Sequence, residues 1–152
     1  MKISEVLSKE RIIINIDWKN KYDVLENLVK VFKASDKVTD ETDLIKKVIE
    51  REKIKSTGIG GGIGIPHAQS PCVKDVVACL CTSKQGIDFD AVDGKPVNLV
   101  FLIVTSEKMN NVYLGLLSRI ARLLVDEAFK QKIINSNSPD EILNLISEKE
   151  TD

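Results

Sequence analysis

The residues best suited to chemistry lie in one block near the middle of the chain, where a histidine follows a run of glycines. Five of the eight glycines lie between Gly58 and Gly64, and His67 is the only histidine among the 152 residues. An imidazole is largely neutral near pH 7, so one ring nitrogen can act as a nucleophile while the other donates to a carbonyl. Successive glycine N–H groups can form a concavity that binds an anion. We therefore interpret the block as a nucleophile, oriented by the fixed torsion of Pro66, that faces an anion-binding loop.

The glycine run matches neither common nucleotide-binding motif. A P-loop needs a lysine directly after its last glycine, and no lysine occurs between positions 55 and 74. The dinucleotide fingerprint needs a third glycine at a position that here holds Ile63, Ile65 or His67, whichever glycine begins the motif. We therefore expect no cofactor. A flexible connection between a helix and a strand remains the alternative role for the glycines.

A cation, Arg51, lies sixteen residues before His67. Helical spacing places it in the last turn of the preceding helix. Its guanidinium could offer a planar fork to the oxygens of a phosphate. A cation at this position could equally complement the negative end of the helix dipole. Both interpretations remain open from the sequence.

Apolar patterns predict the elements that position this block. There are 24 charged residues in residues 1–55, seven in 56–105 and fourteen in 106–152. A charge-poor middle indicates a buried sheet with helices around it. The predicted order is a strand at 12–16, helices around 24–32 and 40–51, strands around 64–67, 76–82 and 97–105, and helices around 114–124 and 138–146. We therefore predict a single α/β domain, residues 1–152, with a mixed sheet covered on both faces.

Particular residues mark two helix starts and a turn. Thr39 and the acidic residues after it predict the start of the second helix, because acidic groups complement the helix dipole there. In the last helix, Ser138 would be the cap, Pro139 the first residue, and Glu141 would reach back to the cap. The segment Asp93–Pro96 predicts a turn between the last two strands.

The composition excludes several classes of protein. With 43% hydrophobic and 30% charged residues, the chain is not typical of disordered proteins. A net charge of −1 argues against binding to nucleic acid through its phosphates. No run approaches the roughly 18 apolar residues of a membrane span, and the first residues lack the apolar core of a signal peptide. We expect a cytoplasmic protein without direct membrane insertion.

Three cysteines, Cys72, Cys79 and Cys81, lie close together. Reduced thiols that behave as small hydrophobic side chains are the simplest interpretation, since Cys79 and Cys81 would point to the same face of a strand. A zinc module with three cysteines and His67 as ligands is the alternative. Its paired C-x-x-C knuckles are absent, so we predict no metal site.

Several motifs resemble the enzyme IIA domain of the fructose/mannitol type, from the bacterial phosphoenolpyruvate-dependent sugar phosphotransferase system. Its nitrogen-regulatory relatives share these motifs. The matching segments are Arg51-Glu52, Ser56-Thr57-Gly58-Ile59-Gly60, Gly64-Ile65-Pro66-His67-Ala68, Asp93-Gly94-Lys95-Pro96-Val97, Leu116–Leu124 and the helix that begins at Ser138. The resemblance extends over nearly the whole chain.

The resemblance implies an α/β/α sandwich with a mixed sheet and a phosphotransferase function. His67 would accept a phosphoryl group from the histidine phosphocarrier protein and pass it to a IIB component of a sugar permease. Arg51 would be the cation beside it, and Thr57, Gly58 and Gly60 would help to hold the phosphate. A nitrogen-regulatory protein that controls target proteins through its phosphorylation state is the alternative.

Relatives in this family usually carry a second histidine at the start of the third long helix, where this sequence has Tyr113. They also usually have alanine at the position of Gly64. A phenol, with a pKa of about 10, is neutral at pH 7. Its hydroxyl can still donate one hydrogen bond to a phosphate oxygen or to His67. We expect Tyr113 to lie within reach of His67, with simple packing at the helix start as the alternative.

Overall fold

A mixed six-stranded sheet forms the centre of the fold in the computed structural model, which describes residues 1–151. The strand order is β1-β5-β6-β3-β2, and β4 also pairs with β6. β5 and β6 are antiparallel, as are β2 and β3, whereas β1 runs parallel to β5 and both β3 and β4 run parallel to β6. The strands are β1 (Ile12–Ile13), β2 (Gly58–Gly60), β3 (Ile63–Gly64), β4 (His67–Gln69), β5 (Val76–Ile87) and β6 (Val97–Thr105).

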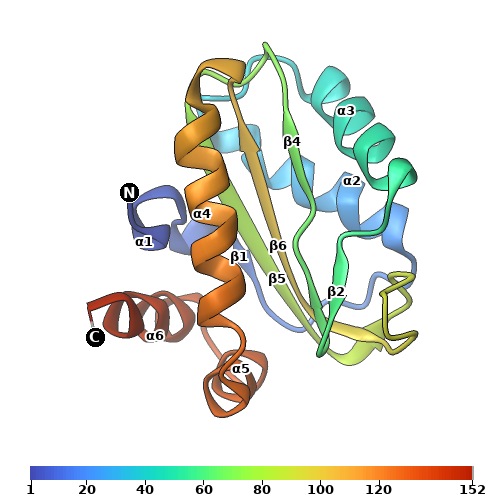
Figure 1. Cartoon of the computed structure of the whole chain (residues 1–152), viewed down its shortest axis with the longest axis vertical. Coiled ribbons are helices and arrows are strands. Elements are labelled where there is room, and N and C mark those ends of the chain that lie inside the picture. Colours follow the sequence, from blue (N-terminus) through green and yellow to red (C-terminus); the bar gives the residue numbers. More distant parts are fainter. Residues whose placement is uncertain (152) are drawn as a thin grey trace.

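Helices cover both faces of this sheet. In Figure 1, α4 lies in front of β5 and β6, α2 lies behind them, and α3 runs beside β4. The α-helices are α1 (Ile3–Val6), α2 (Lys21–Val31), α3 (Glu41–Ile54), α4 (Asn110–Leu123), α5 (Glu127–Ile134) and α6 (Pro139–Thr151). Short 3-10 turns occur at Lys9–Arg11, Phe32–Ala34 and Glu107–Met109.

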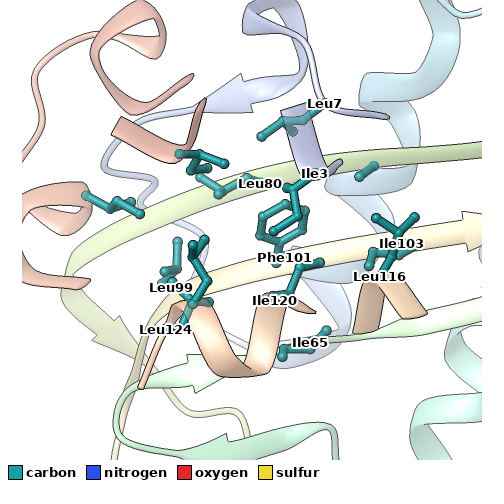
Figure 2. Packing of buried hydrophobic residues seen from close by; sticks show 14 of the residues in the cluster. Ile3, Leu7, Ile65, Leu80, Leu99, Phe101, Ile103, Leu116, Ile120 and Leu124 are labelled. Carbon is teal, nitrogen blue, oxygen red and sulfur yellow. The ribbon is translucent and has the colours of Figure 1, made fainter. Parts of the chain in front are cut away.

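Alternating side chains of the two long strands divide the core into two layers. On β6, Phe101 and its alternate neighbours pack with α1, α4, α5 and α6, and part of this cluster is shown in Figure 2. Leu102 and its alternate neighbours pack against α2 and α3 on the other face. This is the period of two that a strand imposes on its side chains. The predicted α/β/α sandwich with a mixed sheet is confirmed.

The first strand is shorter than predicted. The sequence predicted a strand over residues 12–16, but pairing in β1 ends at Ile13. Asn15 adopts a left-handed conformation with φ of 48°, which a regular strand cannot contain. Its N–H donates to Thr82 Oγ1, and Ile16 N–H donates to the carbonyl of Thr82. The chain therefore stays beside β5 without continuing the ladder.

The predicted strand around residues 64–67 is two strands separated by Ile65 and Pro66. Both pieces keep the same register on β6, because Ile63 pairs with Leu99 and His67 with Ile103. The interruption therefore inserts no extra residue. It places His67 at the start of the second piece, β4.

The helix starts are largely as predicted. Ser138 Oγ accepts the Glu141 N–H, and Pro139 is the first residue of α6. Glu141 reaches back as expected, although its carboxylate accepts from Asn137 N–H, one residue before the cap. Asp40, rather than Thr39, caps α3, because its carboxylate accepts the Asp43 N–H.

Two helices, α1 and α5, were absent from the sequence prediction. α1 has only four residues, too few for a periodic pattern to be recognised. α5 has eight residues, and Asp126 caps it.

Candidate functional site

The break in the edge strand sets the position of His67. Ile65 N–H turns away from β6 and donates to the carbonyl of Thr57 at 3.0 Å. Pro66 has no N–H, but its carbonyl accepts the Ile103 N–H of β6 at 3.1 Å. β4 therefore resumes its pairing at His67, with the imidazole held close to the backbone of the break.

One hydrogen bond determines the tautomer of the imidazole. His67 Nδ1 lies 2.8 Å from the carbonyl oxygen of Ile65. A carbonyl can only accept, so Nδ1 carries the proton and Nε2 keeps its lone pair. Ile65 is itself anchored, because its side chain is buried in the apolar cluster that contains Ile120 of α4 (Figure 2). One ring nitrogen therefore donates to a carbonyl and the other keeps its lone pair, which is the arrangement that a nucleophilic imidazole requires.

The surroundings of His67 lower its pKa. Burial has the largest effect, because it disfavours the charged imidazolium. The Ile65 carbonyl raises the pKa, the positive charge of Arg51 lowers it, and the negative charge of Glu52 raises it. The net shift of the His67 pKa is downward, which favours the neutral imidazole near pH 7.

Two neighbouring hollows share His67 and Arg51 in their walls. The first hollow is mostly apolar and is lined by Arg51, Lys55, Ser56, Thr57, Ile59, Ile65, His67, Leu117 and Ala121. The second is more polar and is lined by Lys47, Glu50, Arg51, Ile54, His67, Ala68, Gln69 and Tyr113. The imidazole therefore lies where a hollow with an apolar wall joins one with several charged groups.

Arg51 lies in the last turn of α3, as predicted. Its Nη1 donates to the carbonyl of Lys55 at 3.1 Å, just after the end of the helix. Within residues 1–151 it forms no ion pair with a carboxylate, and its other N–H groups have no protein acceptor. Arg51 therefore contacts a carbonyl at the helix end and keeps donors that no protein acceptor uses, and phosphate binding by these donors stays a prediction.

Thr57 lies in the wall of the first hollow, but its hydroxyl is already engaged. Thr57 Oγ1 donates to Glu52 Oε1 at 2.5 Å, and its backbone N–H donates to Glu52 Oε2 at 2.8 Å. The side chain is buried. The predicted role in holding phosphate has no support from this placement, because the hydroxyl proton is directed at a carboxylate.

Gly58 and Gly60 line neither hollow. Gly58 packs closely against Ala91, where an added Cβ would lie 2.8 Å from the Ala91 Cα. Gly60 begins a left-handed turn and faces the carboxylate of Asp93. The next N–H in this turn, that of Gly61, donates to Asp93 Oδ2. Neither glycine lies in the walls around His67, because Gly58 packs against Ala91 and the turn at Gly60 faces Asp93.

Tyr113 contacts His67, as expected. The two ring centroids are 5.8 Å apart and the ring planes are inclined by 58°. Tyr113 is 6% exposed, and burial raises the pKa of its phenol, which is therefore neutral at pH 7. Within residues 1–151 the hydroxyl has no hydrogen-bond partner. The phenol thus lies in the second hollow with its donor unused.

Sequence reasoning missed a buried ion pair next to the wall of the first hollow. Glu52 and Lys21 form an ion pair of 3.0 Å, with side chains 1% and 9% exposed. The only signal for Glu52 was its place in the motif directly after Arg51. Lys21 had no signal, because its partner lies 31 residues away in the chain.

The cysteines lie in the core rather than at the site. Cys79 and Cys81 face the layer of α2 and α3, and Cys79 Sγ donates to the carbonyl of Leu28. Burial raises the pKa of both thiols, which keeps them protonated. No three potential metal ligands come together within residues 1–151, so the zinc alternative has no support. Over the same residues, no helix combines the length and apolar character of a membrane span.

Comparison with known sequences identifies a family. The family described as "Phosphoenolpyruvate-dependent sugar phosphotransferase system, EIIA 2" matches residues 5–149. The chain is 37% identical over 148 residues to the fructose-specific EIIABC component of Bacillus subtilis, with 97% of this chain and 23% of that protein covered. It is 31% identical over 146 residues to the fructose-specific EIIA component of Haloferax volcanii, with 96% and 95% covered. It is 30% identical over 148 residues to the nitrogen regulatory protein of Bradyrhizobium diazoefficiens, with 97% and 95% covered.

Solved structures show the same fold. The nitrogen regulatory protein IIA-Ntr from Neisseria meningitidis matches with a TM-score of 0.89 and 26% identity, over 95% of this chain and 98% of that chain. Enzyme IIA for mannitol from Escherichia coli, in complex with phosphorylated enzyme IIB, matches with a TM-score of 0.79 and 20% identity, over 93% and 96%. The family match over nearly the whole chain, together with this fold, shows that the protein belongs to the EIIA type 2 family of the phosphoenolpyruvate-dependent sugar phosphotransferase system.

Proposed function

We propose that the chain is a cytoplasmic phosphohistidine carrier, which receives a phosphoryl group on His67 Nε2 from the histidine phosphocarrier protein and passes it to a IIB component during sugar uptake. The observation that carries this proposal is the state of the imidazole. Nδ1 donates to Ile65, Nε2 keeps its lone pair, and Arg51 beside it has no carboxylate partner within residues 1–151. A neutral nucleophile next to an uncommitted guanidinium suits an incoming phosphate.

Phosphoryl transfer between two histidines mainly requires that the reacting atoms are correctly positioned and that the charge on the phosphoryl oxygens is stabilised. The Nε2 lone pair forms a bond to phosphorus while the bond between phosphorus and the donor imidazole breaks, and that electron pair returns to the donor ring. Charge spreads over the oxygens of the transferred group, where the Arg51 fork can bind them. Nδ1–H remains bonded to Ile65, so the phosphorylated ring stays in place. The same steps in reverse order release the group to the acceptor.

The surface around His67 suits a protein acceptor. The apolar wall of the first hollow includes Ile59, Leu117 and Ala121, and Ile59 is 47% exposed. Partly exposed apolar groups around a reactive atom are typical of protein contact surfaces. The complex of the mannitol enzyme IIA with phosphorylated enzyme IIB gives the class of acceptor that we propose.

Regulation is the second candidate function. The nitrogen regulatory protein from Neisseria meningitidis has a higher TM-score, 0.89, than the mannitol enzyme, 0.79. A relative named as a nitrogen regulatory protein is also matched over nearly its full length. In this alternative the same phosphorylation of His67 would change the affinity for a target protein instead of supplying a sugar permease.

A label-and-chase experiment tests the proposal. The purified chain is labelled by the phosphorylated histidine phosphocarrier protein and, after removal of the donor, mixed with a fructose-type or mannitol-type IIB protein. We expect the label to leave the chain for IIB within the time of mixing. Label that stays on the chain with every IIB protein tested would favour regulation, and a chain that never takes up label would contradict both candidates.

We predict a modest catalytic contribution from Tyr113. Tyr113→Phe keeps the ring contact with His67 but removes the unused hydroxyl donor. Losing one neutral hydrogen bond of about 0.5–1.5 kcal/mol should slow transfer by about two- to tenfold. Single-turnover transfer from the phosphocarrier measures this rate. Tyr22→Phe is the control, since Tyr22 is the other tyrosine and lies exposed on α2. A Tyr113→Phe rate equal to that of the unmodified chain would assign Tyr113 to packing.

A further inference from the structure

A buried ion pair beneath the site joins the start of α2 to the end of α3. Lys21 Nζ lies 3.0 Å from Glu52 Oε2, and both side chains are almost fully buried. Removing two charges from water is costly, and an apolar pair is often as stable in the same place. The pair is therefore poorly explained by stability alone, which directs attention to its other contacts.

The other contacts of Glu52 are with Thr57, which lies in the wall of the first hollow. Glu52 accepts three hydrogen bonds: one from Lys21, one from the Thr57 backbone N–H at 2.8 Å and one from the Thr57 hydroxyl at 2.5 Å. Both carboxylate oxygens are used. Thr57 is thus held by its backbone and its side chain at once, three residues after the end of α3.

From Thr57 the hydrogen bonds continue to the imidazole. The Thr57 carbonyl accepts the Ile65 N–H at 3.0 Å, and the Ile65 carbonyl accepts His67 Nδ1–H at 2.8 Å. Pro66 contributes a fixed torsion between these two residues. An unbroken series of hydrogen-bonded residues therefore runs from Lys21 and Glu52, through Thr57 and Ile65, to His67.

We propose that Glu52 is a positioning residue for His67: by holding Thr57, and through it Ile65, it keeps the imidazole as the Nδ1–H tautomer with Nε2 directed to the phosphoryl group. The inference rests on the proposed carrier function and deepens it. It also changes the role of Thr57 from a phosphate ligand to the link between Glu52 and the strand break. Small displacements of a nucleophile can slow a reaction about a hundredfold, so this support bears on rate.

Glutamine replaces the carboxylate only in part. The carboxylate of Glu52 accepts from three donors, whereas a glutamine amide has one acceptor oxygen, and its NH₂ group fits the Thr57 hydroxyl only if that hydroxyl rotates to accept. Glu52→Gln also leaves the charge of Lys21 buried without a partner. The double variant K21M/E52M removes both buried charges and both acceptor oxygens, so the Thr57 N–H and hydroxyl lose their partner.

The test uses nitrogen NMR of the imidazole, which reports the tautomer of the unphosphorylated chain. Because the chain has one histidine, every imidazole signal belongs to His67. We expect the unmodified chain to show the Nδ1–H tautomer, and Glu52→Gln and K21M/E52M to show a mixture with Nε2–H. Transfer in both variants should slow by about ten- to a hundredfold. Glu26→Gln, which removes an exposed carboxylate on α2, should leave both readouts unchanged.

Thr57 variants separate a positioning role from phosphate binding. Thr57→Val removes the hydroxyl that donates to Glu52, and Thr57→Ser keeps it. We expect Thr57→Val to increase the Nε2–H tautomer before any phosphate is present, and Thr57→Ser to restore the unmodified behaviour. If the hydroxyl instead binds phosphate, Thr57→Val will slow transfer and leave the tautomer unchanged, which would contradict the inference.

Two further outcomes are decisive. A folded K21M/E52M chain that keeps the pure Nδ1–H tautomer would overturn the positioning role. A chain that is never phosphorylated, but whose tautomer responds to Glu52→Gln as expected, would refute the carrier function while supporting the link from Glu52 to His67.

Discussion

His67→Ala should abolish phosphorylation of the chain completely. The reacting nitrogen is lost, and no other histidine exists to take the group. In the unmodified chain, incubation with the phosphorylated carrier protein should produce an adduct that is labile in acid and stable in alkali, as expected of a phosphorus–nitrogen bond. Gel analysis after each treatment measures it. Label that persists in His67→Ala with the same stability would assign the phosphoryl group to another residue.

A matched variant separates loss of the nucleophile from damage to the site. His67→Asn can still donate an amide N–H toward the Ile65 carbonyl, which otherwise loses its partner from His67 Nδ1. It has no nucleophilic ring nitrogen. We expect both variants to keep the melting temperature of the unmodified chain to within a few degrees, because His67 is partly exposed, and both to remain unlabelled.

Arg51→Lys should slow phosphoryl transfer although it keeps the positive charge. A lysine ammonium is a point charge and cannot provide the planar fork that binds two phosphate oxygens. Losing one charge-assisted hydrogen bond costs about 1.5–3 kcal/mol, which corresponds to a rate lower by roughly ten- to a hundredfold. Single-turnover transfer from the phosphocarrier measures this effect.

The control for Arg51 lies on the same helix end. Lys53 is also a cation in the last turn of α3, but it lines neither hollow. Lys53→Gln should leave the transfer rate unchanged and alter only the melting temperature. An Arg51→Lys chain with an unchanged rate and a lowered melting temperature would show that Arg51 serves the helix end, where its Nη1 donates to Lys55.

Much of the fold could be predicted because local patterns determine it. The alternation in β5 and β6 arises from the period of two in a strand, so their two buried faces can be read from residues such as Phe101 and Leu102. The start of α6 follows from Ser138 and Pro139, which act within one turn of helix. Ile65 and Pro66 did not look like an interruption, because apolar side chains continue through them. The direction of the Ile65 N–H depends on Thr57, in another segment.

The sequence by itself identified His67 as the candidate nucleophile, with one ring nitrogen expected to donate to a carbonyl. It did not show which nitrogen or which carbonyl, because the orientation of Ile65 depends on its hydrogen bond to Thr57 in another segment. Arg51 could be placed at the end of its helix from periodicity alone, since helical spacing fixes position within an element.

Only the tertiary structure decided which of the other candidates meet His67. Tyr113 reaches it because α4 packs over the sheet, whereas Gly60 is turned toward Asp93. Thr57 lines the hollow, but its hydroxyl is bound by Glu52, whose charge is balanced by Lys21 from another helix. The physical reason is that a hydrogen-bond donor or acceptor has several possible partners, and the three-dimensional packing of distant segments selects one. Residue type limits the hydrogen bonds and ion pairs that Thr57 and Glu52 can form. The packing of α2 against α3 selects the ones that they form.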